Sequence, residues 1–252
     1  KLKSTEKLDF KDFIINASDF GIPQNRKRFI MVGFRKDLSK DNNAIENFWN
    51  SIKTSRELDN KVTVRHAISS LPFIKSNAGK ELLKIKDFSG AMSSYEKLMI
   101  DKNLKYVLNH KSRSHMQGDL DRYRWYANYA EKNKKNATLK DLPERLFPNH
   151  KSAKNFLKNN KKPVHIDRFK VQLWDEPSKT ITAHIRKDGH AFIHPNTSQN
   201  RSLTVREVAR LQSFPDNYAF CGPRGSQFQQ IGNAVPPILS NVIAKAIREA
   251  IT

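Results

Sequence analysis

The segment FQQIGNAVPP, Phe228 to Pro237, constrains this chain more than any other stretch. Gly232 has no side chain, so it permits either a tight turn or a close approach of two backbones. Pro236 and Pro237 can begin a helix, because the N–H that proline lacks has no partner in the first turn of a helix. Taken alone, the segment is also compatible with a plain turn before a helix. The segments around it decide between these interpretations.

A second informative segment, RSLTVREVARLQSFPD, covers residues 201–216. Thr204 and Glu207 have the Thr-x-x-Glu spacing of a capping box, which predicts that a helix begins here. We expect that helix to stop near Phe214-Pro215. Beyond Pro237, apolar residues recur at helical spacing and form one stripe that requires a partner surface. The stripe consists of Leu239, Val242, Ile243, Ala246 and Ile247.

Near the start of the chain, the segment GIPQNRKR holds Gln24, Arg26 and Arg28 at every second position. Alternate residues of a strand point to the same side, so we expect these three side chains on one face. On its own, the pattern is more typical of an exposed basic strand than of a site. The apolar run FIMVGF, residues 29–34, follows directly and predicts a buried strand.

The middle of the chain contains weaker signals. Residues 63–72 have the caps of a short helix. A second helix is predicted from Leu120 onward, with Arg122 and Arg124 on the side opposite its apolar residues. Residues 131–163 are rich in lysine and asparagine, which predicts loops with one or two short helices. The apolar positions of the second helix are Leu120, Tyr123, Ala127 and Ala130.

Positive charge distinguishes this chain from an ordinary soluble protein. Its 46 lysine and arginine residues outnumber its 25 acidic residues, which gives a formal net charge of +21. Residues 101–170 carry 18 of the basic residues and only seven of the acidic ones. An excess of this size attracts polyanions, and nucleic acid is the first candidate partner. A membrane is not expected as a partner, because no long apolar run or basic amphipathic helix stands out.

Two short segments have the composition of strands: PSKTITA, residues 177–183, and GHAFIHP, residues 189–195. The residues HIRKDGH join them, so we expect a hairpin with Arg186 and Lys187 at its tip. These two side chains are either DNA contacts or parts of a solvated turn. The sequence favours neither alternative.

Other reactive side chains are few. His184, His190 and His194 match no zinc spacing and have no cysteine beside them, so we expect no metal site. Cys221 is the only cysteine, and we interpret it as a bystander thiol. A single cysteine excludes an internal disulfide and fits a reducing compartment, so we expect a cytoplasmic protein.

Together and in this order, the blocks at residues 17–34, 203–216 and 228–237 closely resemble the C-terminal motifs of DNA (cytosine-5) methyltransferases. The resemblance is strongest over residues 10–36 and 175–250. The family's opening motifs do not occur in this sequence: there is no early glycine-rich cofactor loop, no Glu-Asn-Val segment and no Pro-Cys-Gln loop with its nucleophile. Because the first residue is lysine rather than methionine, a C-terminal fragment is slightly favoured over a natural split subunit.

The resemblance implies an α/β fold in three parts. Residues 1–60 would be the remainder of a Rossmann-like, S-adenosylmethionine-dependent methyltransferase domain. Residues 61–215 would form a mixed α+β target-recognition domain. Residues 216–252 would form the cofactor-pocket turn and a C-terminal helix that returns to the catalytic domain.

The resemblance also implies roles for individual residues. Arg28 corresponds to the arginine that donates to O2 of the target cytosine, and Arg26 and Gln24 would help to hold that site. Arg206 and Glu207 are expected to be scaffold residues. The expected wall of the S-adenosylmethionine pocket consists of Asn233, Ala234, Val235 and Phe214. The expected DNA contacts are Thr180, Thr182, Arg186 and Lys187.

These correspondences imply the DNA-recognition and cytosine-holding part of an enzyme that transfers methyl from S-adenosylmethionine to C5 of a flipped cytosine. Its partners would be double-stranded DNA and an N-terminal portion or subunit with the nucleophilic cysteine, because Cys221 lacks the Pro-Cys-Gln context. The alternative is a stand-alone DNA-binding module or an inactive remnant, which would cover its last apolar helix internally. The lysine- and asparagine-rich composition suggests an AT-rich bacterial genome, and hence a restriction–modification system acting at the nucleoid.

Overall fold

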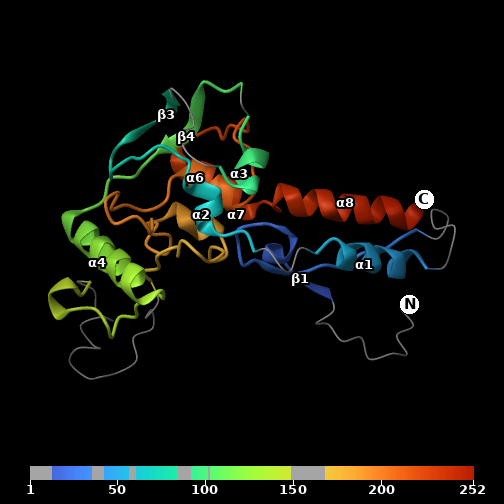
Figure 1. Cartoon of the computed structure of the whole chain (residues 1–252), viewed down its shortest axis with the longest axis horizontal. Helices are drawn as coiled ribbons and strands as arrows, with labels where there is room; N and C mark the ends of the chain where they lie inside the picture. The colour runs from blue at the N-terminus through green and yellow to red at the C-terminus, as the bar shows by residue number, and fades with distance from the viewer. Residues whose placement is uncertain (1–12, 36–42, 57–60, 85–91, 102, 149–167) are drawn as a thin grey trace.

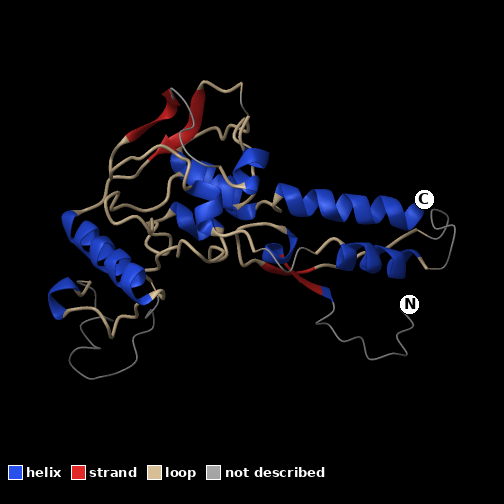
Figure 2. Ribbon diagram, viewed as in Figure 1, coloured by secondary structure: helices blue, strands red, loops and turns tan. Residues whose placement is uncertain are grey.

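The computed structural model describes residues 13–35, 43–56, 61–84, 92–101, 103–148 and 168–252. Figure 1 shows an elongated molecule in which α1 (Ala44–Thr54) and α8 (Pro237–Ile251) lie side by side as one arm. The helix α4 (Gln117–Asn133) lies at the opposite end, and a group of shorter helices lies between them. Figure 2 shows that the described strands are short, and they form two-stranded antiparallel ladders. Among the described residues, no helix combines the length and apolar character that a membrane crossing requires.

The sheet of the arm consists of β1 (Ile14–Asn16) and β2 (Lys27–Phe29), joined through the 3-10 helix η2 (Ala17–Phe20). The prediction of a buried strand over residues 29–34 is wrong. The strand ends at Phe29, which is 52% exposed, and Met31 beyond it is 85% exposed. Two strands of three residues have too few neighbours to cover every apolar side chain of the run.

The long C-terminal helix begins at Pro237, as the sequence predicted. Its apolar stripe packs against α1, where Leu239 and Ala246 are buried. Val242 and Ile243 are half-buried, and Ile247 remains 38% exposed. The partner surface that the stripe requires therefore lies mainly within this chain.

The centre of the molecule is built around α6 (Val205–Leu211), all of whose residues are buried. The predicted capping box is confirmed: the Glu207 N–H donates to Thr204 Oγ1 at 3.2 Å, and the Thr204 N–H donates to the Glu207 carboxylate at 2.7 Å. Residues 63–72 contain the predicted short helix. The elements around α6 are α2 (Val64–Ile68), α3 (Ser94–Met99), α7 (Arg224–Asn233), and the antiparallel pair β3 (Gly79–Lys84) and β4 (Tyr106–Lys111).

The helix α4 confirms the apolar spacing predicted from Leu120 onward, because Tyr123, Ala127 and Ala130 are buried in a separate core and Leu120 packs against it half-buried. The two arginines predicted on the opposite side differ in exposure. Arg124 is exposed, but Arg122 is mostly covered and donates to Asp119 at 2.7 Å and to the Leu146 carbonyl at 2.7 Å. The loop predicted over residues 131–163 is described only to residue 148, where it includes the 3-10 helix η3 (Glu144–Leu146).

The hairpin predicted from residues 177–183 and 189–195 is wrong, although both segments are described. Ser178 instead bridges Gln24 in parallel, and Ile193 bridges Val171 and Ser202. The 3-10 helix η4 (Ala183–Arg186) lies where the hairpin turn was expected. Alternation of apolar and polar residues favours extended backbone, but it does not determine which segment pairs with that backbone. Here the pairing segments are distant in the sequence or lie outside the expected hairpin.

Candidate functional site

Arg26 joins three segments that are far apart in the sequence. Its guanidinium donates to the carbonyls of Ile181 at 2.6 Å, Gly232 at 3.3 Å and Ala234 at 3.2 Å. The side chain is only 5% exposed, and burial together with the nearby charge of Arg28 lowers the pKa of Arg26 to about 10. A buried guanidinium that lost these acceptors would be costly to keep, so the three segments are held together strongly.

Gln24 connects the same junction to the end of α6. Its side-chain amide donates to the carbonyl of Leu211 at 3.2 Å and to the side-chain oxygen of Gln212. Its own oxygen accepts from the Ile181 N–H at 2.9 Å. Gln212 in turn donates to the carbonyl of Ala234 at 2.9 Å. The blocks at residues 17–34, 203–216 and 228–237 therefore meet at one hydrogen-bonded junction with the segment of residues 177–183.

Arg28 does not share the environment of Arg26 and Gln24. The expectation that all three side chains occupy one face is wrong, because Gln24 and Arg26 precede β2 and are buried, whereas Arg28 lies within β2 and is exposed. The Arg28 guanidinium donates to the carbonyl of Lys27 at 2.7 Å. The exposed guanidinium of Arg28 therefore follows the buried guanidinium of Arg26 by two residues.

The predicted DNA contacts lie in the segment around Ile181, which adjoins this junction. Thr180 donates to the Asn25 carbonyl at 2.5 Å, which places it next to the segment that carries Arg28. Thr182, Arg186 and Lys187 are exposed on and beside η4. The residues Thr182–Lys187, called the η4 loop below, thus present four exposed polar or basic side chains, of which His184 is the fourth.

Gly232 allows the η4 loop to lie directly on α7. A Cβ at this position would be 2.4 Å from the Ala183 nitrogen and 2.5 Å from the Thr182 carbonyl carbon, both of which are backbone atoms. The close approach predicted for Gly232 is therefore confirmed. The alternative of a tight turn is wrong, because Gly232 lies in the last turn of α7. Arg186 adds a contact to the same helix by donating to the Gln229 side chain at 3.0 Å.

The expected cofactor wall lies at the end of α7. Asn233 and Val235 are exposed, and the Val235 side chain is 56% exposed, so an amide and an apolar group are available on one turn. The Ala234 carbonyl is already used by Arg26 and Gln212. Phe214 is buried between Tyr218 and Phe220, with ring centroids 5.0 and 5.1 Å away. Asn233 and Val235 are thus accessible on this turn, whereas Phe214 is buried beside two neighbouring rings.

Comparison with known proteins now identifies the family. A model of the family described as C-5 cytosine-specific DNA methylase matches residues 3–249. The chain belongs to this family. It is 40% identical over 245 residues to the type II methyltransferase M.Bpa9945I of Bacillus paralicheniformis, covering 94% of this chain and 50% of that protein. It is 32% identical over 243 residues to the type II methyltransferase M.DdeI of Desulfomicrobium norvegicum, covering 93% of this chain and 53% of that protein.

A solved structure has a similar fold. It is a crystal structure of a candidate DNA modification methyltransferase encoded within an Escherichia coli prophage, with a TM-score of 0.59 and 23% sequence identity. The match covers 94% of this chain and 59% of that chain. The mixed α/β fold is therefore methyltransferase-like. The chain spans about half the length of the curated relatives named above.

Buried arginines form the scaffold of this cytosine-5 methylase chain. Arg206, with no exposed surface, donates to the carbonyls of Leu108 at 2.9 Å, Pro215 at 3.1 Å and Tyr218 at 2.6 Å, which agrees with the scaffold role expected for it. Arg210 binds the Asp216 carboxylate at 2.6 Å, a pair that sequence reasoning missed. The only local signal for such pairs is an arginine and a carboxylate six residues apart around a capped helix.

Two of the three histidines considered for metal binding form hydrogen bonds within the protein. His190 Nδ1 lies 2.7 Å from the Tyr123 hydroxyl, and His194 Nδ1 accepts from the Asn196 N–H at 3.1 Å. His184 is exposed on η4. Within the described residues, no group of three or more histidine, cysteine, aspartate or glutamate side chains could hold a metal ion. Cys221 is exposed.

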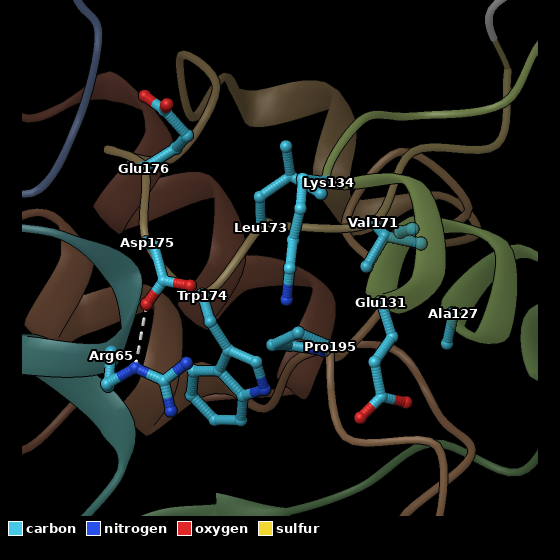
Figure 3. A pocket seen from close by; sticks show the side chains of 11 residues that line it. Arg65, Ala127, Glu131, Lys134, Val171, Leu173, Trp174, Asp175, Glu176 and Pro195 are labelled. Atoms are coloured by element: carbon cyan, nitrogen blue, oxygen red, sulfur yellow. Dashed lines mark hydrogen bonds and ion pairs between the residues drawn. The ribbon is translucent and has the colours of Figure 1, made fainter.

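A cavity of about 370 Å³ lies between α4 and residues 171–176 (Figure 3). Arg65 donates to the Asp175 carboxylate there at 2.8 Å and lies 5.2 Å from the centroid of Trp174. Carboxylates and basic side chains both line the cavity, so it provides no net positive field for a phosphate. None of the predicted site residues lines it. The lining charged residues are Arg65, Glu131, Lys134, Asp175 and Glu176.

Proposed function

We propose that this chain is the cytosine-holding and DNA-reading part of a DNA (cytosine-5) methyltransferase. The observation that carries this proposal is the junction at Gln24 and Arg26. It joins the blocks at residues 17–34, 203–216 and 228–237 to the segment around Ile181 by hydrogen bonds and leaves Arg28 exposed beside it. In such an enzyme the target cytosine leaves the duplex before it reacts, because the reacting atoms are inaccessible within the base stack. Arg28 is our candidate for the side chain that meets the flipped base.

The chemistry explains why an arginine suits this position. Addition of a thiolate to C6 of cytosine pushes electron density toward O2 and N3. A guanidinium held at O2 stabilises this charge as it develops, and it does so more strongly in a site that excludes water. Arg26 adds a second positive charge close by, although its hydrogen bonds are directed to backbone carbonyls. S-adenosylmethionine would supply the methyl group, with Asn233 and Val235 forming one wall of its pocket.

The nucleophile is expected from a polypeptide segment outside this chain. Cys221 is the only cysteine, and its FCGPRG context differs from the Pro-Cys-Gln loop. Double-stranded DNA is the proposed substrate, and the charge of +21 supports it. Thr180, Thr182, Arg186 and Lys187 are the proposed contacts. The division at residues 60 and 215, the role in bacterial restriction–modification and the cytoplasmic location belong to the same proposal.

A stand-alone DNA-binding module or inactive remnant is a second candidate, and one observation favours it. Such a module would cover the stripe of its last helix internally, and α1 covers most of that stripe. The sheet at β1 and β2 argues in the opposite direction. Ile14 and Phe29 pair across it and are 43% and 52% exposed, so its apolar surface is not fully covered by the described residues.

One experiment separates the two candidates. The chain is expressed in a host without cytosine-5 methylation, alone and together with the catalytic portion of a relative that contains the Pro-Cys-Gln loop. Genomic 5-methylcytosine is then read by bisulfite sequencing. We expect methylation in a defined sequence context only in the combined state. Methylation by the chain alone would contradict the inference that its nucleophile is missing, and the absence of methylation in both states would favour the stand-alone module.

A further inference from the structure

Arg113 is a buried arginine that the sequence did not single out. It lies two residues beyond β4 and is 8% exposed. Its guanidinium donates to the carbonyls of Ile185 at 2.5 Å, Lys187 at 2.9 Å and Arg186 at 3.4 Å. These carbonyls lie at the end of η4, where a short helix has no further N–H groups to satisfy them. A planar guanidinium can reach several such acceptors at once, which a lysine ammonium cannot do in the same geometry.

The same guanidinium also contacts α7. It lies 4.6 Å from the ring centroid of Phe228, a fully buried residue of that helix. The backbone of Arg113 is itself fixed, because its carbonyl accepts from the Asn77 N–H at 3.0 Å. The neighbouring Ser112 hydroxyl donates to the Lys75 carbonyl at 2.8 Å. Arg113 is thus seated between the β3–β4 ladder, α7 and the η4 loop.

We propose that Arg113 is the positioning residue that holds the η4 loop in its DNA-reading conformation. Gly232 supports the start of the loop through its close approach to Thr182 and Ala183, and Arg113 holds the end of the loop through its hydrogen bonds to residues 185–187. Arg113 is not placed to contact DNA, because the side chain is buried and its two terminal nitrogens donate to backbone carbonyls inside the protein. It acts on DNA only through the positions of Thr182, Arg186 and Lys187. The link to DNA rests on the proposed function, whereas the ordering of the loop does not.

Arg206 provides a matched control within the same chain. It is also a buried arginine that donates to three backbone carbonyls, and its guanidinium lies 6.0 Å from the ring centroid of Phe220. None of its acceptors lies in the η4 loop. Replacing either arginine with lysine keeps the positive charge but removes the planar guanidinium. General destabilisation should therefore appear in both variants. Loosening of the η4 loop should appear only in Arg113→Lys.

The first measurement is hydrogen–deuterium exchange of the full chain, read by mass spectrometry on peptides that cover residues 182–187. With Arg113→Lys we expect these amides to exchange about tenfold faster or more, because their local opening becomes easier. With Arg206→Lys, exchange there should change no more than in the rest of the chain. Equal acceleration throughout the molecule, or none at residues 182–187, would overturn the positioning role. If Arg113→Lys does not fold, Phe228→Leu tests the same positioning role, because it removes the aromatic ring that the Arg113 guanidinium contacts. The same faster exchange at residues 182–187 is expected.

The second measurement is binding of the full chain to a duplex enriched from a random pool and to a scrambled duplex, at several salt concentrations. With Arg113→Lys we expect the preference for the enriched duplex to fall by about tenfold while the salt slope stays unchanged, since no phosphate contact is lost. An altered slope would assign Arg113 to the phosphate backbone and overturn the proposal. If the unmodified chain binds no duplex while the exchange result holds, the proposed function fails and the positioning role stands.

Discussion

The guanidinium of Arg201 donates to both carboxylate oxygens of Glu207, each at 2.7 Å, and both side chains are buried. Burial alone would raise the pKa of the Glu207 carboxyl, but Arg201 and the neighbouring His194 hold it well below its ordinary value. The same carboxylate caps α6 through the Thr204 N–H. One ion pair therefore fixes the start of the helix around which the centre of the molecule is built.

Breaking this pair should destabilise the fold strongly. With Arg201→Ala, the buried Glu207 carboxylate loses its partner, and we expect the free energy of unfolding to fall by about 3–5 kcal/mol. Urea denaturation followed by circular dichroism measures it. Arg65→Ala is the control, because the pair of Arg65 and Asp175 is exposed and should contribute less than about 1 kcal/mol. Similar losses for the two variants would contradict the role assigned to the buried pair.

Acid should destabilise the protein before its carboxylates titrate. Burial lowers the pKa of His115 to about 4 and that of His194 to about 3, whereas an unfolded histidine titrates near about 6.5. The folded state therefore binds fewer protons between these values, and the free energy of unfolding should decrease as the pH falls from about 6.5 to 5. Glu207 does not contribute in this window, because its stabilisation is lost only below its unfolded pKa of about 4.3.

The measurement for this prediction is urea denaturation at several pH values between 5 and 7.5. His194→Gln should flatten the pH dependence, since one buried neutral histidine is removed. Substitution of the exposed His184 by alanine is the control and should leave the slope as it was. A slope that is unchanged in His194→Gln would show that this histidine is not held neutral by burial.

Gly232→Ala should disrupt the packing of the η4 loop against α7. The added Cβ would lie within 2.8 Å of backbone atoms of Thr182 and Ala183, so one of the two elements must move. We expect a loss of about 1–3 kcal/mol, which exceeds the helix propensity gained from alanine. Gly225→Ala in the same helix is the control, because a Cβ there would meet no described atom within 4 Å. Calorimetric melting temperatures distinguish the two, and equal stability of both variants would contradict the close approach.

Substitution of Arg28 should lower the rate of methyl transfer, whereas substitution of Arg26 should lower the stability of the fold. In the assembled enzyme, Arg28→Ala should lower the rate of methyl transfer by a factor that corresponds to about 3 kcal/mol while DNA binding changes little. Arg26→Ala should lower the melting temperature, because three carbonyls and the surrounding segments lose their common donor. Single-turnover transfer of labelled methyl groups and thermal unfolding give the two readouts. Equal losses of binding and rate in Arg28→Ala would assign that residue to the phosphate backbone.

Lys187 should contribute to DNA binding through charge. If it contacts a phosphate, Lys187→Ala should make the log–log salt slope shallower by about 0.9 and weaken binding to all sequences alike. If it reads a base, the variant should instead narrow the difference between preferred and scrambled duplexes. Arg124→Ala, at an exposed position of α4, provides a comparison with the same change in charge. A salt response that is flat for the unmodified chain would contradict the assignment of its positive charge to nucleic acid.

Local sequence patterns predicted α2, α4, α6 and α8, but they gave no prediction of α1, α3 or α7. The capping box at Thr204, the start of α8 at Pro237 and the apolar spacing of α4 are all confirmed. Each depends on residues within a few positions of one another, and the physical effect acts over the same short range. The close approach at Gly232 was one of the two alternatives that the sequence left open, because only glycine leaves room for it.

Only the tertiary structure decided which of the similar residues are buried and what they bind. Arg26 and Arg28 are two positions apart, yet one donates to carbonyls 155 and 206 residues away and the other is exposed. The segments expected to form a hairpin likewise pair with distant backbone instead of with each other. Alternation along a chain indicates extended backbone and two faces, but the partner of each face is selected by the whole chain. A buried guanidinium such as Arg26 or Arg113 has its role only once distant carbonyls surround it, and no local pattern contains them.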